Sequence, residues 1–251
     1  MGLNGTETVI VHSSMKSIGE VDGKADTVLD SLCSFFKDGL LVLPSFSYTA
    51  VNICNSSKYY EKTTPSCIGL LPELFRLRPD VYRSLHPNHS LAACGKDAKD
   101  FVSGHEKCLT SFDKSGPFGK LLERNAKALL IGVTLNRATI IHAIIEWSDV
   151  AILSKEDLHF ISIDRNGVEY PVRMYYHLGA QWDNFNRALD ILLEQNAVRK
   201  VKFGDADSLL LDCRQTFDIL RNILIEDPKF FYNPDCAASI QYPGLKFSDL
   251  K

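Results

Sequence analysis

The sequence predicts an α/β protein, a three-layer fold with a mainly parallel central sheet flanked by helices and a less regular C-terminal elaboration. One observation is that short apolar runs alternate with segments of helical period through residues 1–150. The other is the length of 251 residues, at which α/β chains often form one domain. We therefore expect one domain over residues 1–251, with its core over about 1–150 and the elaboration over about 151–251.

Apolar runs that stop at glycine, proline or polar residues predict the strands. These runs cover residues 8–11, 40–43, 91–95 and 128–133, with strand-like pieces at 160–163 and 172–176. Apolar side chains at helical spacing predict helices over residues 28–36, 70–75, 136–147, 181–195 and 213–225. Asp22 is the expected cap of the first helix. The polar segment 45–67 predicts a long loop over a site.

The composition excludes several classes of protein. Hydrophobic residues make up 45% and charged residues 24%, which is typical of a globular chain and not of a disordered one. The 28 basic and 31 acidic residues give a formal charge of −3, so no global positive field attracts nucleic acid or an anionic membrane. No apolar run approaches the roughly 18–20 residues that span a bilayer. We expect small-molecule partners and a monomer or homodimer.

The seven cysteines stand singly in the sequence, mostly among apolar neighbours. An odd count without a framework of spacings favours reduced thiols over disulfides. The first residues also lack the basic and apolar regions of a secretory signal. These features lead us to expect a cytoplasmic protein.

A serine-rich turn directly follows the first predicted strand. It contains Ser13, Ser14, Lys16, Ser17 and Gly19. Hydroxyls, a lysine and backbone N–H groups at a strand-to-helix turn are typical of an anion site, most often for phosphate. The spacing is neither that of a Walker loop nor that of a dinucleotide fingerprint. The alternative is a turn whose serines only cap a helix.

His142 lies early in a predicted helix, with Thr139 as a possible cap. The positive end of the helix dipole favours neutral imidazole, which can act as a base. Glu146 follows four residues later on the same face, where it could orient a ring nitrogen. The alternative is a packed histidine next to a solvated glutamate.

Two further pairs of side chains have the spacing of metal ligands. They are His86 with His89, and His105 with Cys108. Three histidines and a thiolate could bind zinc tetrahedrally, although such pairs are also common by chance. A zinc-dependent protein stays open as an alternative, while the favoured interpretation has no metal.

Taken together, the sequence resembles the antibiotic N-acetyltransferase family, known for its aminoglycoside 3-N-acetyltransferases. Five blocks in the same order carry the resemblance: VHSSMKSIG at 11–19, LPSF at 43–46, RSLHPNHS at 83–90, SGPFGKL at 115–121, and LLIGV at 129–133 followed by TIIH at 139–142. The likeness extends from about residue 4 to at least 150. It implies an α/β fold and transfer of an acetyl group from acetyl-CoA to a primary amine of an aminoglycoside or amino sugar.

The resemblance also implies roles for individual residues. It places the serine-rich loop at the CoA phosphates, with Arg83 as a further phosphate partner and Thr139 at the cofactor. His142 is the implied general base, and His86 and Glu73 are expected to line the substrate cleft. Polycationic substrates call for carboxylates, yet the loop 45–67 offers only Glu61, with Glu73 and Asp80 just beyond it.

The sequence departs from the family beside the expected base. Family members commonly carry a glutamate three residues after the histidine, where this chain has Ile145, with Glu146 one place later. Because positions three and four along a helix both lie near the starting face, Glu146 is the expected substitute. A CoA-binding homologue with little catalysis therefore stays open as an alternative.

Overall fold

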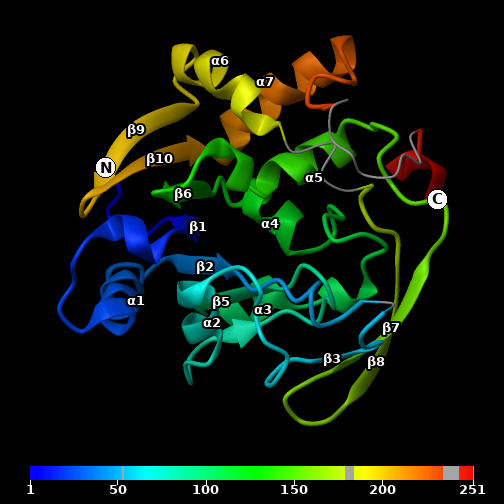
Figure 1. The fold of residues 1–251 in the computed structure, drawn as a ribbon, viewed down its shortest axis with the longest axis horizontal. Coiled ribbons are helices and arrows are strands. Elements are labelled where there is room, and N and C mark those ends of the chain that lie inside the picture. The colour runs from blue at the N-terminus through cyan, green and yellow to red at the C-terminus, as the bar shows by residue number, and fades with distance from the viewer. Residues whose placement is uncertain (53, 179–183, 234–242, 251) are drawn as a thin grey trace.

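The computed structural model describes residues 1–52, 54–178, 184–233 and 243–250. Its largest feature is a seven-stranded sheet with the order β4-β5-β2-β1-β6-β10-β9 (Figure 1). The strands in this order are Tyr82–Arg83, Leu91–Gly95, Leu40–Pro44, Thr8–Ser13, Lys127–Ile131, Ala206–Asp212 and Val198–Phe203.

The centre of the sheet is parallel. Strand β1 pairs in parallel with both β2 and β6, whereas β5 and β4 on one side and β10 and β9 on the other are joined by antiparallel pairings. Five strands therefore run in one direction, and only β5 and β10 run against them. The predicted α/β class and central sheet are confirmed, as are the strands expected over residues 8–11, 40–43, 91–95 and 128–133.

Helices cover both faces of this sheet, as predicted. Side chains alternate along β1, so that Val9 and Val11 join one core and Ile10 joins the other. The first core is covered by α1 (Lys24–Phe35) and α2 (Leu70–Arg76). The second core is covered by α3 (Ala98–Val102), α4 (Pro117–Glu123), α5 (Ile140–Trp147), α6 (Leu189–Glu194) and α7 (Cys213–Glu226).

Helix α1 begins differently from the expectation. The residue at its N-cap is Gly23 with φ of 73°, and no side chain caps the helix, so the assignment of Asp22 was wrong. Glycine adopts this left-handed conformation without the steric cost that a side chain adds. The helix is stabilised instead by burial of Val28, Leu29 and Leu32 against the sheet.

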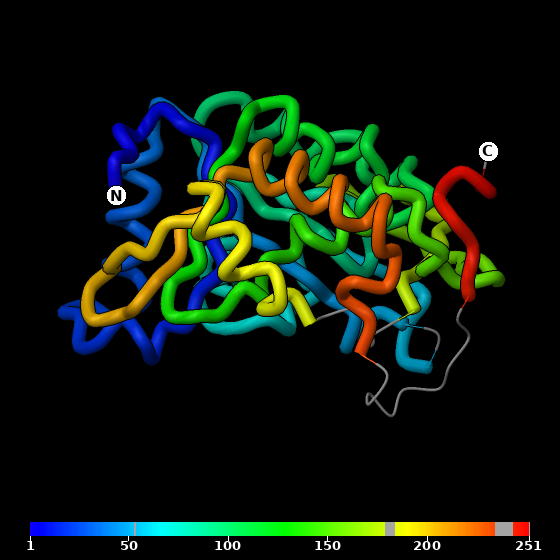
Figure 2. The backbone as a smooth tube through the Cα atoms, turned by 90° about the horizontal axis from the view of Figure 1, so that it is seen from above, coloured from blue at the N-terminus to red at the C-terminus, as the bar shows by residue number. Residues whose placement is uncertain are grey.

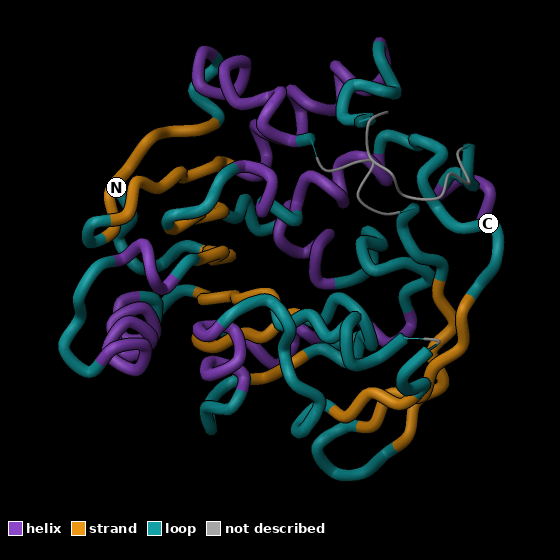
Figure 3. The backbone as a smooth tube through the Cα atoms, in the orientation of Figure 1, coloured by secondary structure: helices purple, strands orange, loops and turns teal. Residues whose placement is uncertain are grey.

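A second, three-stranded sheet stands beside the first and contains part of the predicted loop (Figure 3). Its order is β3-β7-β8, with bounds Lys58–Tyr60, Leu158–Ile163 and Glu169–Met174. Tyr59 in β3 is fully buried in a small core with Phe160 and Val172. The predicted loop over residues 45–67 is therefore interrupted by one short strand, and the rest of its described residues lie outside helices and strands.

The hairpin of β9 and β10 was not predicted. Strand β10 pairs with β6, so a segment from the last third of the chain completes the main sheet. Figure 2 shows this hairpin beside the blue N-terminal segment, and the Arg199 guanidinium donates to the carbonyl of Met1. Within the described ranges, no helix has the length and apolar character needed to cross a bilayer.

Candidate functional site

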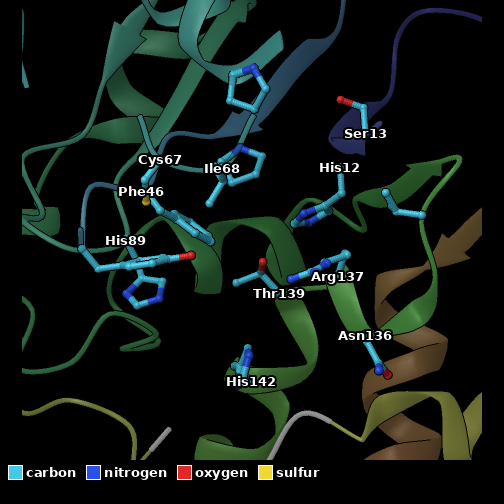
Figure 4. Close-up of a pocket in the computed structure, with 14 residues that line it drawn as sticks. His12, Ser13, Phe46, Cys67, Ile68, His89, Asn136, Arg137, Thr139 and His142 are labelled. Carbon is cyan, nitrogen blue, oxygen red and sulfur yellow. The ribbon is translucent and has the colours of Figure 1, made fainter. Parts of the chain in front are cut away.

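A cavity of about 450 Å³ opens where β1, β2 and β6 end (Figure 4). Binding sites of open α/β sheets form at this edge, outside the carboxyl ends of the parallel strands. The lining residues are His12, Ser13, Pro44, Phe46, Tyr48, Cys67, Ile68, Pro72, His89, Val133, Asn136, Arg137, Thr139 and His142. Both ends of the predicted loop over residues 45–67 contribute to it.

The serine-rich turn reaches this cavity through Ser13 at the end of β1. Its Oγ atom is buried and has no hydrogen-bond partner among the described residues. Ser14 and Ser17 hold the turn together, because Ser17 Oγ donates to Ser14 Oγ at 2.9 Å. The backbone N–H of Ser14 also donates to the carbonyl of Ile131 at 2.9 Å, which ties the turn to β6.

Lys16 and Gly19 of the same turn lie outside the lining. Lys16 is exposed in a short 3-10 helix, η1 (Met15–Ile18). Gly19 has φ of 92°, and a Cβ atom there would lie 2.2 Å from Asp205 Oδ2. A close approach to the β9–β10 turn therefore requires glycine at this position.

Helix α5 presents Thr139 and His142 to the cavity. Thr139 occupies the N-cap position, although its side chain makes no capping hydrogen bond. Arg137 lies two residues before it and is exposed at the edge of the cavity, and its guanidinium group has no ion-pair or hydrogen-bond partner in the described part of the chain. It is the one charged side chain in the described lining, which includes no carboxylate.

His142 is held between aromatic rings. Its imidazole stacks on Phe112 with centroids 5.6 Å apart and meets Phe185 edge-on at 4.8 Å. Burial lowers the pKa of His142 to about 3, and the neighbouring His177 adds to the effect. The ring is therefore neutral near pH 7, with its buried Nδ1 atom lacking a partner among the described residues. A neutral imidazole at a cavity can accept a proton.

Contrary to the expectation from the sequence, Glu146 does not contact His142. Its Oε2 atom lies 2.7 Å from His177 Nε2, and its Oε1 atom accepts a hydrogen bond of 2.6 Å from Thr110 Oγ1. Burial raises the pKa of Glu146 to about 8, against the opposing effect of the Thr110 hydrogen bond. The His177 ring meets that of His142 edge-on at 5.8 Å, so the carboxyl group reaches the expected base only through a second histidine.

The helix geometry explains why Ile145 is not a glutamate here. Ile145 is fully buried in the larger core together with Ile141 and Ile144. A carboxylate at this position would lose its hydration without gaining a partner from these apolar neighbours. The acidic side chain lies one position later, at Glu146, where it forms hydrogen bonds with Thr110 and His177.

Arg83 is a structural residue in this fold and does not line the cavity. The residue is 4% exposed, and its guanidinium donates to the carbonyl oxygens of Ser45, Glu61 and Thr64 and to Ser90 Oγ. These bonds fasten the start and end of the loop over residues 45–67 to β4. Arg83 lines another cavity, of about 350 Å³, together with Arg76, Arg78 and Arg165.

His86 and Glu73 also lie away from the lining. His86 is fully buried and packs against the ring of His105 at 4.6 Å. Glu73 binds Arg76 through both carboxylate oxygens and accepts from the backbone N–H of Ser66. Glu61 is likewise bound to Arg165, so neither of these carboxylates stands free to attract a cation.

The two histidine pairs do not assemble a metal site. His105 has both nitrogens occupied, Nδ1 by Ser84 Oγ at 2.8 Å and Nε2 by the carbonyl of Ser111 at 3.0 Å. His89 contacts Ser111 Oγ and lines the cavity, whereas Cys108 is not part of that lining. No group of three or more His, Cys, Asp or Glu side chains within the described ranges is arranged to hold an ion.

Sequence reasoning missed His12, Arg137 and His177. His12 lies on β1 with its Nε2 atom buried and unpartnered among the described residues, and burial lowers its pKa to about 3. A histidine in an otherwise apolar strand was a signal for it. Arg137 follows the predicted strand over residues 128–133, and a basic residue just after a parallel strand was a signal for it. His177 had no local signal, because its partner Glu146 is 31 residues away.

A family model described as Aminoglycoside 3-N-acetyltransferase matches residues 10–225. The chain belongs to this family. The resemblance seen in the five sequence blocks is thereby confirmed. Among curated relatives of the family, the SPbeta prophage-derived aminoglycoside N(3')-acetyltransferase-like protein YokD of Bacillus subtilis is 33% identical over 162 residues, 57% of this chain and 59% of its own.

Other members of the family support the same assignment. An aminoglycoside N(3)-acetyltransferase III of Acinetobacter baumannii is 28% identical over 158 residues, 57% of this chain and 55% of its own. The matched region thus spans less than two thirds of these curated relatives. The crystal structure of YokD superimposes with a TM-score of 0.77 at 25% identity, covering 91% of this chain and 90% of that one.

Two further solved structures share the fold. A mutant of aminoglycoside acetyltransferase AAC(3)-IVa in complex with a gentamicin has a TM-score of 0.79 at 23% identity, covering 93% of this chain and 87% of that one. A binary complex of AAC-IIIb with CoASH has a TM-score of 0.77 at 20% identity, covering 93% and 94%.

Proposed function

We propose that this chain transfers an acetyl group from acetyl-CoA to a primary amine of an aminoglycoside or amino sugar, with His142 as the general base. The observation that carries the proposal is a neutral histidine at a cavity on the carboxyl edge of the parallel strands. Relatives of the family are named aminoglycoside N(3)-acetyltransferases, and one structural neighbour holds CoASH. These names support the reaction class.

The residues around the cavity suit an anionic co-substrate. Arg137 supplies a positive charge without a described partner, and Ser13 Oγ and His12 Nε2 are polar atoms without one. Phosphate oxygens accept hydrogen bonds from guanidinium, hydroxyl and N–H groups. Arg137 is therefore our preferred phosphate partner, ahead of Lys16 and Arg83, while Ser13 and Thr139 stay assigned to the cofactor.

In the proposed reaction, the substrate amine forms a bond to the acetyl carbon and the bond from that carbon to the CoA sulfur breaks. His142 takes the proton that the attacking nitrogen loses, and this proton then goes to the departing thiolate. Positioning of a base in this way contributes about 10²–10⁴ in rate. Phe112 and Phe185 fix the plane of the ring.

Glu146 is proposed as a positioning residue that acts through His177. Its carboxyl group holds His177 Nε2, and the ring of His177 lies against the ring of His142 and that of Phe112. A negative charge on Glu146 favours positive charge on the nearby imidazoles, which is the charge that develops when His142 accepts a proton.

The test is release of free thiol from acetyl-CoA over a panel of gentamicin, sisomicin, apramycin and glucosamine, with CoA binding followed by calorimetry. Thiol release that depends on one amine class supports the proposal and names the substrate. Binding of CoA without release from any amine would favour the homologue with little catalysis. Absence of binding would contradict the assignment of the cavity to CoA.

A further inference from the structure

Cys33 and Cys94 place their sulfur atoms 3.5 Å apart in the reduced protein. Cys33 lies near the end of α1, and Cys94 lies in β5. Both belong to the core that α1 and α2 cover, with Cys94 buried and Cys33 partly exposed. The two sulfurs of a disulfide are about 2.05 Å apart, so a closure of about 1.5 Å is needed.

A guanidinium group lies beside this thiol pair. Arg78 Nη1 binds Asp30 Oδ1 at 2.6 Å, and Asp26 lies 3.6 Å from Nη2. The hydrogen bond from Cys94 lowers the pKa of Cys33, as does Arg78, against the opposing effects of burial and of the Asp30 carboxylate. The same bond and burial raise the pKa of Cys94. The partly exposed Cys33 is thus the partner that forms a thiolate more readily, and the buried Cys94 keeps its proton.

We propose that Cys33 and Cys94 form a modification site that a low-molecular-weight disulfide oxidises to an intramolecular disulfide. The Cys33 thiolate attacks one sulfur of the reagent, forming a mixed disulfide and releasing one thiolate. Cys94 then gives up its proton and attacks the Cys33 sulfur, which releases the second half of the reagent as thiolate. Two electrons pass from the two cysteines to the reagent, which leaves as two thiols.

The cross-link would join two elements that are far apart in sequence. The cysteines are separated by 61 residues, so the closed loop restricts the unfolded chain substantially. They lie at the end of the sheet opposite the cavity, because Cys94 pairs with Leu41 while Leu91 pairs with Pro44 in the lining. The oxidised protein is therefore expected to gain stability and to keep its CoA site.

The experiment treats the full chain with oxidised glutathione, alkylates the remaining thiols under denaturing conditions and maps the peptides by mass spectrometry. The expected result is a Cys33–Cys94 linked peptide, reversed by dithiothreitol, with Tm raised by up to about 10 °C. Cys54 is exposed, so it serves as the control within the same digest and should retain glutathione as a mixed disulfide.

Variants sharpen the test. Cys54→Ser should leave the linked peptide in place, Cys33→Ser should remove it, and Arg78→Gln should slow its formation several-fold. Glutathione that stays on Cys33 while Cys94 is alkylated would overturn the proposal, as would recovery of both cysteines as free thiols. A linked protein with a lowered Tm would also overturn it, since the bond would then form only in a distorted chain.

Discussion

The carboxyl group of Glu146 and the imidazole of His177 lie 2.7 Å apart, and this contact takes the place of the expected one between Glu146 and His142. The acid and the expected base share one face of α5, yet the acid contacts the base only through a second ring. In the proposed mechanism, proton transfer therefore involves three side chains from two segments of the chain.

His142→Ala should lower kcat by about 10²–10⁴ while the Kd for CoA changes by less than about three-fold, because the base is lost and the phosphate contacts remain. Initial rates of thiol release and calorimetric titration measure the two effects. His159→Ala is the matched control, since the His159 side chain is 73% exposed on the second sheet. A variant at His142 that keeps near wild-type turnover would contradict the assignment of the base.

Glu146→Gln keeps the size of the side chain and removes its charge. Because burial raises the pKa of Glu146 to about 8, the wild-type carboxyl group is mostly neutral at pH 7 and ionises above pH 8. The ratio of wild-type to variant kcat should therefore rise by roughly tenfold as the pH passes through 8, as the charge comes to favour protonated imidazole. A ratio that is flat with pH would show that Glu146 has a structural role alone.

Arg137→Gln should weaken CoA binding by about 5- to 20-fold, through loss of one charge-assisted contact. Lys16→Gln is the matched control, because it also removes one positive charge but from a residue that does not line the cavity. It should change the Kd for CoA by less than about two-fold. Calorimetry on the two variants separates the assignments. A larger loss at Lys16 than at Arg137 would favour the phosphate site as the sequence placed it.

Ile145→Glu recreates the spacing common in the family, yet it should destabilise the fold and not raise turnover. The side chain is fully buried among apolar neighbours, and a carboxylate without a partner there costs about 3 kcal/mol or more of unfolding free energy. Ile145→Leu is the control and should cost less than about 1.5 kcal/mol. Urea unfolding measures both, and a stable Ile145→Glu variant with raised turnover would support the homologue with little native catalysis.

Buried histidines should make the protein sensitive to acid. Burial lowers the pKa of His12 to about 3 and that of His105 to about 4, from an ordinary value of 6.5. Below pH 6.5 the unfolded chain binds protons at these residues and the folded chain does not, so stability falls as the pH falls. Each is expected to cost about 1–2 kcal/mol between pH 7 and pH 5.

Glu146 has the opposite dependence, because its raised pKa stabilises the folded protein increasingly as the pH falls from 8 towards 4.5. The stability that this one carboxyl group adds on acidification is smaller than the stability that the several buried imidazoles remove. Urea unfolding at pH 7 and pH 5 checks the balance, and an equal free energy of unfolding at the two values would contradict it.

The parallel centre of the fold was predictable because its strands are buried on both faces and consist of nearly continuous apolar runs, as in Leu40–Pro44. The β9–β10 hairpin was not, since Val198–Phe203 alternates apolar with exposed basic residues and carries no continuous apolar run. The turn at Ser13 and the helix bearing His142 could be predicted because each follows an apolar run that forms a strand of the sheet. The contact of Glu146 with His177 could not, because it depends on how a distant segment folds back over α5.

The loop after β1 is braced by the turn of the hairpin, where the backbone N–H of Asp205 donates to the carbonyl of Ile18 at 3.0 Å. In a chain emerging from the ribosome, β1 can pair with β2 early but must wait for Lys127–Ile131 before its other edge is covered. Contacts of such high sequence separation slow folding. The cavity is lined by residues between positions 12 and 142, so the hairpin turn that braces the loop after β1 is synthesised only after every lining residue has been made.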